Sequence, residues 1–203
     1  MSSGDAKSYR VAEKLKGGTA VTVRAIRPDD RARLGEAFAK LEPGSVYTRF
    51  FSHRGQPSDE ELRAAVEVDF ESTVALVVTV PDGGGAETII GAGRYFLNGP
   101  PGTGSGAEVA FTVEEDFHGQ GIAGLLFRHL ARIARQQGIP ELTAEVLPGN
   151  RGMLAVFARS GLPMQQSAED GVVHVALSLA QPASPDENNR QDPRDANLKQ
   201  TGP

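Results

Sequence analysis

Residues 107–124 read AEVAFTVEEDFHGQGIAG, and this stretch decides how the rest of the sequence is interpreted. Its first seven residues alternate in the manner of a β-strand, and they carry a carboxylate at Glu108. An acidic turn and a glycine-rich turn over 118–124 follow, and the apolar pattern after Gly121 predicts an amphipathic helix. A possible proton acceptor and a possible anion-binding turn therefore stand within one short segment.

The glycine-rich turn admits three interpretations. The segment 119–124 fits the G-x-G-x-x-G pattern of dinucleotide-binding folds, and Glu145 stands about where a ribose-binding acid would. However, a single β-α-β unit among antiparallel strands is not a doubly wound sheet. Alternatively, successive amides from His118 to Gly124 can cradle a pyrophosphate at a helix start, where the helix dipole favours negative charge. The third possibility is a tight turn that uses glycine for its shape alone.

A second glycine-rich segment, 99–106, looks like a nucleotide-triphosphate P-loop. Ser105 occupies the position of the P-loop lysine. A strand follows this segment, whereas phosphate binding by a P-loop needs the N-terminus of a helix. The segment is therefore predicted to be a flexible hairpin loop.

Composition restricts the classes of function. The chain has 203 residues, 39% hydrophobic content, a net charge of -5 and no cysteine. The acidic balance and the lack of a basic block argue against a nucleic-acid partner. No apolar run is long enough to span a bilayer, so we expect no membrane partner and, by default, a cytoplasmic location. The absence of cysteine excludes disulfides, thiolate metal sites and cysteine nucleophiles.

The sequence predicts one domain over 19–180, between a flexible segment at 1–18 and a disordered tail at 181–203. Strands are expected over 20–26, 73–80, 88–97, 107–113, 142–147, 162–166 and 172–179. Helices are expected after Pro28, from the capping box at Ser58, after Gly121 and from Asn150. A further short helix with a compact aromatic group is expected over 46–51.

Several of these features resemble the GNAT superfamily of acetyl-CoA-dependent N-acetyltransferases. The family's pyrophosphate loop reads Gln/Arg-x-x-Gly-x-Gly/Ala, and residues 118–123, HGQGIA, match its last two defined positions, with His118 departing from the first. Asn150, Phe157 and Gly161-Leu162 are similar to the family's last helix. The resemblance covers about 21–179. More narrowly, 107–111 and the region 24–51 look like the catalytic domain of bacterial protein lysine acetyltransferases.

The resemblance implies a mixed α/β fold with a mostly antiparallel central sheet of about seven strands and helices on both faces. It also implies acetyl-CoA as co-substrate. The backbone at the end of the 107–113 strand would bind the pantetheine arm, and the glycine-rich turn would bind the pyrophosphate. The residues so implied as cofactor-binding are Phe111, Thr112, Val113, His118, Gly119, Gln120, Gly121, Ile122, Ala123, Gly124, Asn150 and Phe157.

Glu108 is the candidate catalytic residue. A carboxylate in an otherwise apolar strand is costly unless it is solvated, paired or functional. It could face solvent at an edge or pair with an arginine. In the lysine acetyltransferases that the segment resembles, a glutamate at this position is the general base.

Other polar positions carry weaker signals. Many family members use a tyrosine on the last helix to protonate the leaving thiolate, and Phe157 has no proton to give. Asn150 could bond the cofactor or cap a helix. His118 lies in the loop as a possible phosphate contact, whereas His129 is expected in the core. The histidines show no ligand spacing, so no metal is predicted.

The sequence thus predicts transfer of an acetyl group from acetyl-CoA to an amine with Glu108 as general base. A protein lysine as the acceptor follows from the resemblance alone, and a small-molecule amine is the alternative. A non-catalytic acyl-CoA-binding regulatory domain is the hypothesis from another class, favoured by the missing tyrosine. Nothing in the sequence specifies an oligomeric state.

Overall fold

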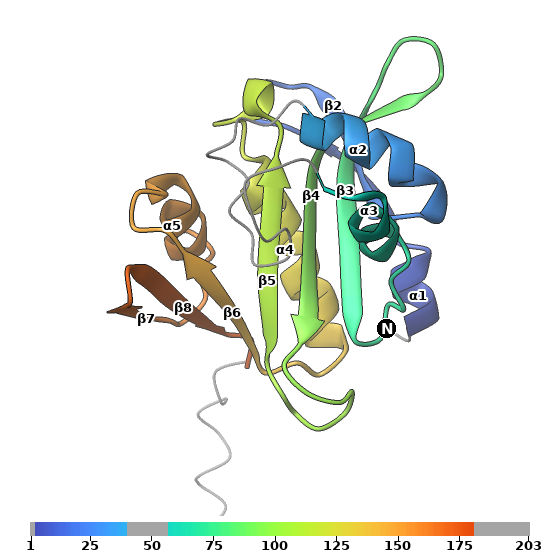
Figure 1. The fold of residues 1–203 in the computed structure, drawn as a ribbon. Coiled ribbons are helices and arrows are strands. Elements are labelled where there is room, and N and C mark those ends of the chain that lie inside the picture. Colours follow the sequence, from blue (N-terminus) through green and yellow to red (C-terminus); the bar gives the residue numbers. More distant parts are fainter. Residues whose placement is uncertain (1–2, 40–56, 181–203) are drawn as a thin grey trace, which may run out of the picture.

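The computed structural model describes residues 3–39 and 57–180 (Figure 1). The predicted aromatic helix at 46–51 and the predicted tail at 181–203 lie outside this part of the chain. The elements are α1 (Ser3–Lys7), β1 (Arg10–Lys14), β2 (Ala20–Ala25), η1 (Pro28–Asp30), α2 (Arg31–Ala39), α3 (Asp59–Val66), β3 (Thr73–Pro81), β4 (Glu87–Leu97), β5 (Ala107–Val113), η2 (Glu115–Phe117), α4 (Ile122–Gln136), β6 (Glu141–Val146), α5 (Arg151–Ala158), β7 (Met164–Glu169) and β8 (Val172–Ser178).

The described strands form one eight-stranded sheet in the order β1-β2-β3-β4-β5-β6-β8-β7. The β5–β6 pair is parallel and the other neighbouring pairs are antiparallel. Helix α4 covers one face of the sheet, and α2 and α3 cover the other (Figure 1). The predicted mixed, mostly antiparallel sheet with helices on both faces is confirmed. The dinucleotide-binding alternative fails because that fold needs a mostly parallel sheet.

The N-terminal segment differs from its prediction. The sequence predicts flexibility over 1–18, but β1 pairs along its whole length with β2. Ala6, Tyr9 and Leu15 are buried in the core. The apolar residues of this segment are too few and too widely spaced to give a strand signal on their own. Packing against the rest of the molecule orders the segment, and the sheet gains its eighth strand.

The second glycine-rich segment is the hairpin loop between β4 and β5. The Asn98 amide donates to the Gly106 carbonyl at 2.9 Å, which closes the loop next to both strands. The loop leads from β4 directly into its antiparallel neighbour β5 and not into a helix. The structure therefore agrees with the hairpin interpretation and not with a P-loop.

A buried ion pair connects β2 to η1. The Arg24 guanidinium on β2 donates to both carboxylate oxygens of Asp30, at 2.6 and 2.7 Å, and to Glu87 at 2.8 Å. Burial favours protonation of Asp30, but the bonds from Arg24 outweigh it and hold the pKa of Asp30 below its ordinary value. Removing one partner of such a pair typically costs about 3–5 kcal/mol. The pair ties η1, which directly precedes α2, to the sheet.

Candidate active site

Strands β5 and β6 are paired at one end only. Their parallel register comprises Ala107 with Leu142 and Glu108 with Thr143. Beyond these pairs the two strands diverge, and the divergence is visible between β5 and β6 in Figure 1. From Val109 to Val113, β5 therefore has a hydrogen-bonded neighbour on the β4 side but none on the β6 side.

The backbone groups that face this open edge can be assigned. The Glu114 amide donates towards β4, to the Ile90 carbonyl at 3.1 Å, and the Ala107 carbonyl accepts from the Thr143 hydroxyl on β6 at 3.4 Å. Successive residues of a strand direct their backbone groups to opposite neighbours. The amides and carbonyls of Val109, Phe111 and Val113 thus point to the open edge. An extended ligand can add to such an edge as a further strand.

Thr112 plays a different part from its two neighbours. Its carbonyl lies on the β4 side, 3.4 Å from where a Cβ on Gly91 would stand. Its backbone is therefore occupied by the ladder with β4, where Thr112 pairs with Ala92. Of the three strand-end residues predicted to bind a cofactor, Phe111 and Val113 offer backbone groups to the open edge and Thr112 does not.

Glu108 stands where the two strands begin to diverge. It is partly buried, and it lies opposite Phe96 on β4 and Thr143 on β6. Residues opposite one another across a ladder share a face, so Glu108 lies on the sheet face that carries Arg94 and Thr112. A carboxylate at the closed end of the divergence can meet a group that enters along this face.

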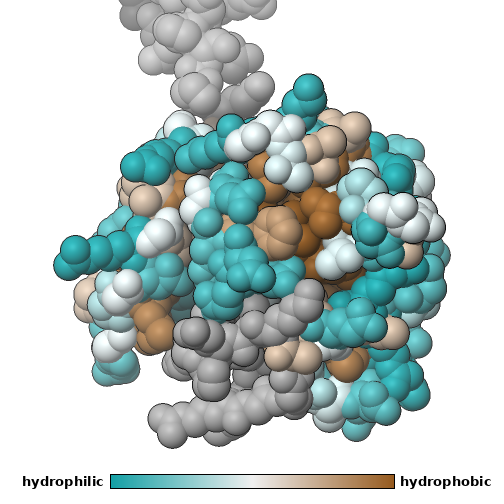
Figure 2. Space-filling view, turned by 90° about the horizontal axis from the view of Figure 1, so that it is seen from above, coloured by the Kyte–Doolittle hydropathy of each residue, from teal (hydrophilic) through white to brown (hydrophobic). Residues whose placement is uncertain are grey.

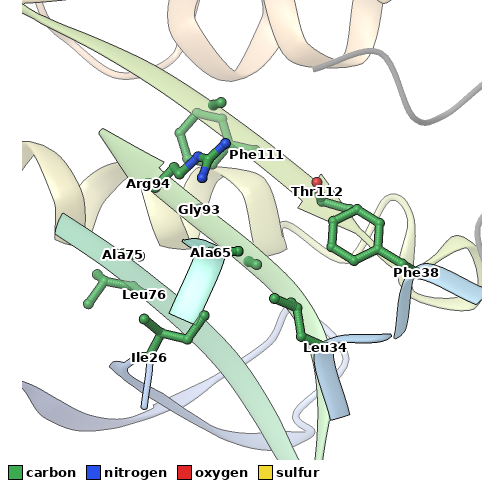
Figure 3. Close-up of a pocket in the computed structure, with 12 residues that line it drawn as sticks. Ile26, Leu34, Phe38, Ala65, Ala75, Leu76, Gly93, Arg94, Phe111 and Thr112 are labelled. Atoms are coloured by element: carbon green, nitrogen blue, oxygen red, sulfur yellow. The ribbon is translucent and has the colours of Figure 1, made fainter. Parts of the chain in front are cut away.

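A small pocket lies on that same face, between the sheet and helices α2 and α3 (Figure 3). Its volume is about 40 Å³, and Leu34, Phe38 and Ala65 line it from the helices. Arg94 and Thr112 line it from the sheet. Burial lowers the pKa of Arg94 to about 10, so this guanidinium still carries its charge at neutral pH. The pocket is apolar with one cationic border.

The glycine-rich turn leads directly into α4. Gly119 and Gly121 adopt φ values of +75° and +90°, a left-handed conformation that favours glycine. Gly121 is the N-cap of α4, and no side chain caps this helix. In the described part of the chain, no backbone carbonyl accepts from the amides of Gly119, Gly121, Ile122, Ala123 or Gly124. The turn therefore presents unpaired amides at the positive end of a 15-residue helix.

His118 holds the turn against the end of β5. Its Nε2 lies 2.9 Å from the Val113 carbonyl, and its Nδ1 lies 3.3 Å from Glu115 Oε2. The Gln120 amide donates to the Phe117 carbonyl, and its side chain to the Asp116 carbonyl, each at 3.4 Å. The side chains of His118 and Gln120 thus shape the turn, while the glycine amides remain available.

Phe157 on α5 is buried with 1% of its surface exposed. Its ring lies 5.4 Å from that of Phe127 and 6.4 Å from that of Phe111. The side chain at the position of the family's tyrosine is therefore packed in an aromatic cluster between β5, α4 and α5. It offers no hydrogen-bonding group to a ligand.

Asn150 is the N-cap of α5, with its Oδ1 accepting from the Met153 amide at 3.0 Å. The expectation that it could cap a helix is confirmed. The cap uses only the side-chain oxygen, and the exposed amide nitrogen can still donate to a ligand.

Figure 2 views the molecule from the end at which β5 terminates. Hydrophobic surface lies in the middle of this face, and hydrophilic residues border it (Figure 2). Within residues 3–39 and 57–180, no cluster of three or more His, Asp or Glu side chains is arranged to hold a metal ion. None of the helices described is both long and apolar enough to cross a membrane.

Sequence reasoning missed two glycines that shape the site from β4. A Cβ on Gly91 would lie 2.6 Å from Ile122 Cγ2, and one on Gly93 would lie 2.8 Å from Phe111 Cδ1. These glycines let the first turn of α4 and the Phe111 ring lie directly on the sheet. The motif Gly91-Ala92-Gly93 in a predicted strand is a signal for such close approach.

Comparisons with known proteins agree with this geometry. The Acetyltransferase (GNAT) family matches residues 45–162, more than half of the chain. Acetyltransferase PA5475 of Pseudomonas aeruginosa is 27% identical over 164 residues, which cover 80% of this chain and 86% of that protein. Acetyltransferase Pat of Mycolicibacterium smegmatis is 30% identical over 148 residues, which cover 73% of this chain and 43% of that protein. The present chain thus matches less than half the length of Pat.

The fold comparison is equally clear. The crystal structure of the GNAT domain of S. lividans PAT matches with a TM-score of 0.74 and 34% sequence identity, covering 83% of this chain and 96% of that one. The fold match and the family match agree with the diverging strands and the uncapped helix start of this chain. The chain belongs to the GNAT family and is an acetyltransferase.

Proposed function

We propose that the protein transfers the acetyl group of acetyl-CoA to an amine, with Glu108 as general base, and that the acceptor is a protein lysine. The observation that carries the proposal is the open edge of β5, which begins directly after Glu108 and ends at Val113, where His118 holds the turn that leads into the uncapped start of α4. This arrangement offers one continuous path from a phosphate-binding turn to a carboxylate.

The residues present fit acetyl-CoA. Unpaired amides at Gly119 and from Gly121 to Gly124 suit its diphosphate, because backbone N–H groups and the helix dipole both favour negative charge. The open backbone groups of Val109 and Phe111, and the Val113 amide, suit the amides of its pantetheine arm, while the Val113 carbonyl is engaged by His118. When bound, acetyl-CoA supplies the acetyl thioester that the acceptor nitrogen attacks.

Glu108 would accept the proton that the acceptor must lose. A lysine ammonium has a reference pKa of about 10.4, so little of it is a free amine at neutral pH. A positioned general base typically contributes about 10²- to 10⁴-fold to the rate. One proton of the ammonium goes to Glu108, directly or through one water, and then to solvent. The nitrogen loses its second proton as the amide bond forms. The departing thiolate takes up one proton and leaves as a thiol, so the protons balance.

Phe157 cannot supply that last proton. It is buried among Phe111 and Phe127 and bears no ionisable group. Water at the open edge of β5 therefore protonates the leaving thiolate in this proposal. We expect the rate to depend on one ionisation at Glu108 and not on a second one at the position of the family's tyrosine.

The acceptor assignment rests on the resemblance of 107–111 to the catalytic domains of lysine acetyltransferases. The local geometry is compatible with it. The pocket on the sheet face that carries Glu108 is small and lined by aliphatic side chains such as Leu34 and Ala65, which suits an aliphatic chain that ends in an amine. Free polyamines and amino acids would share that chain, so they are the acceptors to compare.

The test measures acetyl-CoA consumption by the wild-type chain with lysine-containing proteins, lysine peptides and small amines. Glu108→Gln keeps the size of the side chain and removes the base. It should lower kcat by about 10²- to 10⁴-fold and leave the Kd for acetyl-CoA unchanged. Glu141→Gln is the matched control, since Glu141 is an exposed carboxylate at the start of β6.

Three outcomes separate the hypotheses. Full turnover by Glu108→Gln would show that Glu108 is not the base. Turnover of small amines without any protein substrate would replace the lysine acceptor by a small-molecule acceptor. Tight acetyl-CoA binding with no acceptor at all would favour a non-catalytic acyl-CoA-binding domain.

A further inference from the structure

The turn between β1 and β2 lies against the glycine-rich turn. A Cβ added to Gly121 would stand 3.5 Å from Lys16 Cε and 3.8 Å from both Lys16 Cδ and Cγ. The aliphatic stem of Lys16 therefore runs alongside the N-cap of α4. The ammonium group is one bond beyond Cε, so it lies at the same turn whose amides have no backbone partner.

Lys16 has no ion-pair partner among the residues that the structure describes. It is also exposed. The long, flexible side chain of Lys16 lies over a glycine turn, and its charge gains little stabilisation from the protein itself. It is well suited to an anion that the adjacent amides also bind, because charge-assisted bonds to phosphate are stronger than neutral ones.

The acidic residues before the turn increase the benefit of a cation for binding a phosphate at this position. Glu114, Glu115 and Asp116 directly precede the turn, so the local side-chain charge opposes an approaching phosphate. Glu115 is engaged with His118. The amides and the helix dipole provide only partial positive charge, and a full positive charge at Lys16 would offset the nearby carboxylates.

A chain of hydrogen bonds, buried at Tyr9 and His129 and more exposed towards Arg128, holds β1 along α4 and so fixes the base of the turn that bears Lys16. The Tyr9 hydroxyl lies 2.5 Å from His129 Nδ1, and His129 Nε2 lies 3.0 Å from Glu13 Oε1. A carboxylate can only accept, so Nε2 carries the proton and Tyr9 donates to Nδ1. Arg132 donates to the Tyr9 oxygen, and Arg128 donates to Glu13 at 3.1 Å.

These contacts follow the helix towards its start. Tyr9 meets α4 at His129 and Arg132, Glu13 meets it at Arg128 and His129, and Lys16 meets it at Gly121. The N-terminal segment is thus laid along α4 with Lys16 at the helix N-terminus. This arrangement places a residue from the turn that follows the edge strand β1 at the glycine-rich turn.

We propose that the Lys16 ammonium binds the diphosphate of acetyl-CoA together with the amides of Gly119 and Gly121–Gly124. The inference rests on the proposed function, because it assigns Lys16 to the same site. Lys16 is a cofactor-binding residue in this account and has no part in the proton transfer at Glu108. Its contribution is therefore expected in the affinity for acetyl-CoA, not in kcat.

The test compares Lys16→Met with Lys14→Met by isothermal titration of acetyl-CoA. Methionine keeps most of the aliphatic stem on Gly121 and removes the charge. Lys14 is an exposed lysine on the same hairpin, so its variant controls for the net charge of the chain. Lys16→Met should raise the Kd about tenfold, a loss of about 1.4 kcal/mol, and Lys14→Met should leave it unchanged. Lys16→Arg should restore most of the affinity.

Two further ligands locate the contact. Acetyl-pantetheine lacks the phosphates, so its KM should be the same for Lys16→Met and the wild type. Dephospho-CoA keeps the diphosphate and lacks the 3′-phosphate, so its affinity should fall with Lys16→Met as that of acetyl-CoA does. An effect confined to ligands with the 3′-phosphate would overturn the diphosphate assignment.

Equal Kd values for Lys16→Met and Lys14→Met would overturn the inference while leaving the proposed function intact. An equal loss with acetyl-pantetheine would do the same, since it would indicate a structural role. If the wild-type chain itself does not bind acetyl-CoA, the proposed function fails first.

Discussion

Helices α3 and α4 begin in opposite ways. At the start of α3, Ser58 Oγ accepts from the Glu61 amide at 3.2 Å, and Glu61 Oε2 accepts from the Ser58 amide at 2.7 Å. At the start of α4, the N-cap is Gly121, and no side chain caps the helix. Each helix N-terminus leaves several amides without a partner inside the helix. The difference teaches that α3 satisfies one such amide, that of Glu61, with its own cap, whereas the amides at the start of α4 have no such partner and are the ones that we propose to bind a ligand.

Helix α5 supports this contrast. Its start is capped by Asn150, as the start of α3 is capped by Ser58. The uncapped helix is also the one that follows the open edge of β5. A missing cap at this place is thus a feature of the site, and it can be tested against the capped helices of the same molecule.

The largest expected effect comes from breaking the start of α4 with Gly121→Ala. The added methyl has room, since its nearest neighbour in the protein would be Lys16 Cε at 3.5 Å. The residue's φ of +90° disfavours any side chain, at a cost of about 1–2 kcal/mol. Relief of that strain moves the amides, so we expect the Kd for acetyl-CoA to rise about tenfold, measured by titration calorimetry.

Gly138→Ala is the control for that variant. Gly138 lies just beyond the other end of α4 with φ of +77°, and an added methyl group there would have no atom within 4 Å. The substitution should lower the free energy of unfolding by a similar amount and leave the Kd unchanged. Equal Kd values for the two variants would mean that the start of α4 does not bind the ligand.

A smaller effect is expected from removing the cap of α3 with Ser58→Ala. The variant leaves the Glu61 amide without its side-chain partner and should lower the free energy of unfolding by about 1 kcal/mol. Urea unfolding measures this change. The Kd for acetyl-CoA should stay the same, because these amides serve only the helix. A weaker affinity in Ser58→Ala would remove the distinction between the two helix starts.

The smallest expected effect is a pH dependence of stability that arises in the body of α4. Polar groups there form hydrogen bonds within the chain, as they do at the start of α3. Burial lowers the pKa of His129, and the nearby charges of Arg128 and Arg132 lower it further. The charge of Glu13 acts in the opposite direction but does not cancel the lowering. The unfolded chain, with a reference pKa of about 6.5, therefore takes up a proton before the folded chain does. The contribution of neutral His129 to the free energy of unfolding is fully present above about pH 6.5. It is lost as the pH falls through the folded-state pKa.

Urea unfolding of the wild type and of His129→Gln between about pH 7.5 and about pH 5.5 measures that loss. The wild type should lose more stability over this interval than the variant, since glutamine does not titrate. The comparison of slopes cancels the titrating groups that do not contact His129. Parallel slopes would mean that His129 does not resist protonation in the folded chain.

Much of the fold followed from local patterns. The alternating pattern of side chains predicted β5 and its neighbouring strands, and the capping box at Ser58 predicted the start of α3. The mostly antiparallel sheet then decided among the glycine signatures, because β5–β6 is its one parallel pair among the described strands and a dinucleotide fold needs a mostly parallel sheet. These features are set by residues near one another in sequence, which is why the sequence reveals them.

What the sequence did not reveal depends on distant contacts. Lys14 and Lys16 look alike in the sequence, yet one projects into solvent and the other lies on Gly121. Tyr9 and His129 are 120 residues apart and meet only because β1 is laid along α4. The part of β5 that becomes an open edge is set by where β6 diverges from it, and no residue type marks that point.

The central claim is that the unpaired amides at the start of α4 bind the diphosphate of acetyl-CoA. Amide chemical shifts from nitrogen–proton correlation spectra, followed during titration with acetyl-CoA and with acetyl-pantetheine, test it most directly. We predict that the amides of Gly119 and Gly121–Gly124 shift with acetyl-CoA but not with acetyl-pantetheine, while the amides of Asp59–Glu61 shift with neither. Unmoved glycine amides at saturating acetyl-CoA, or equal shifts with both ligands, would contradict the account.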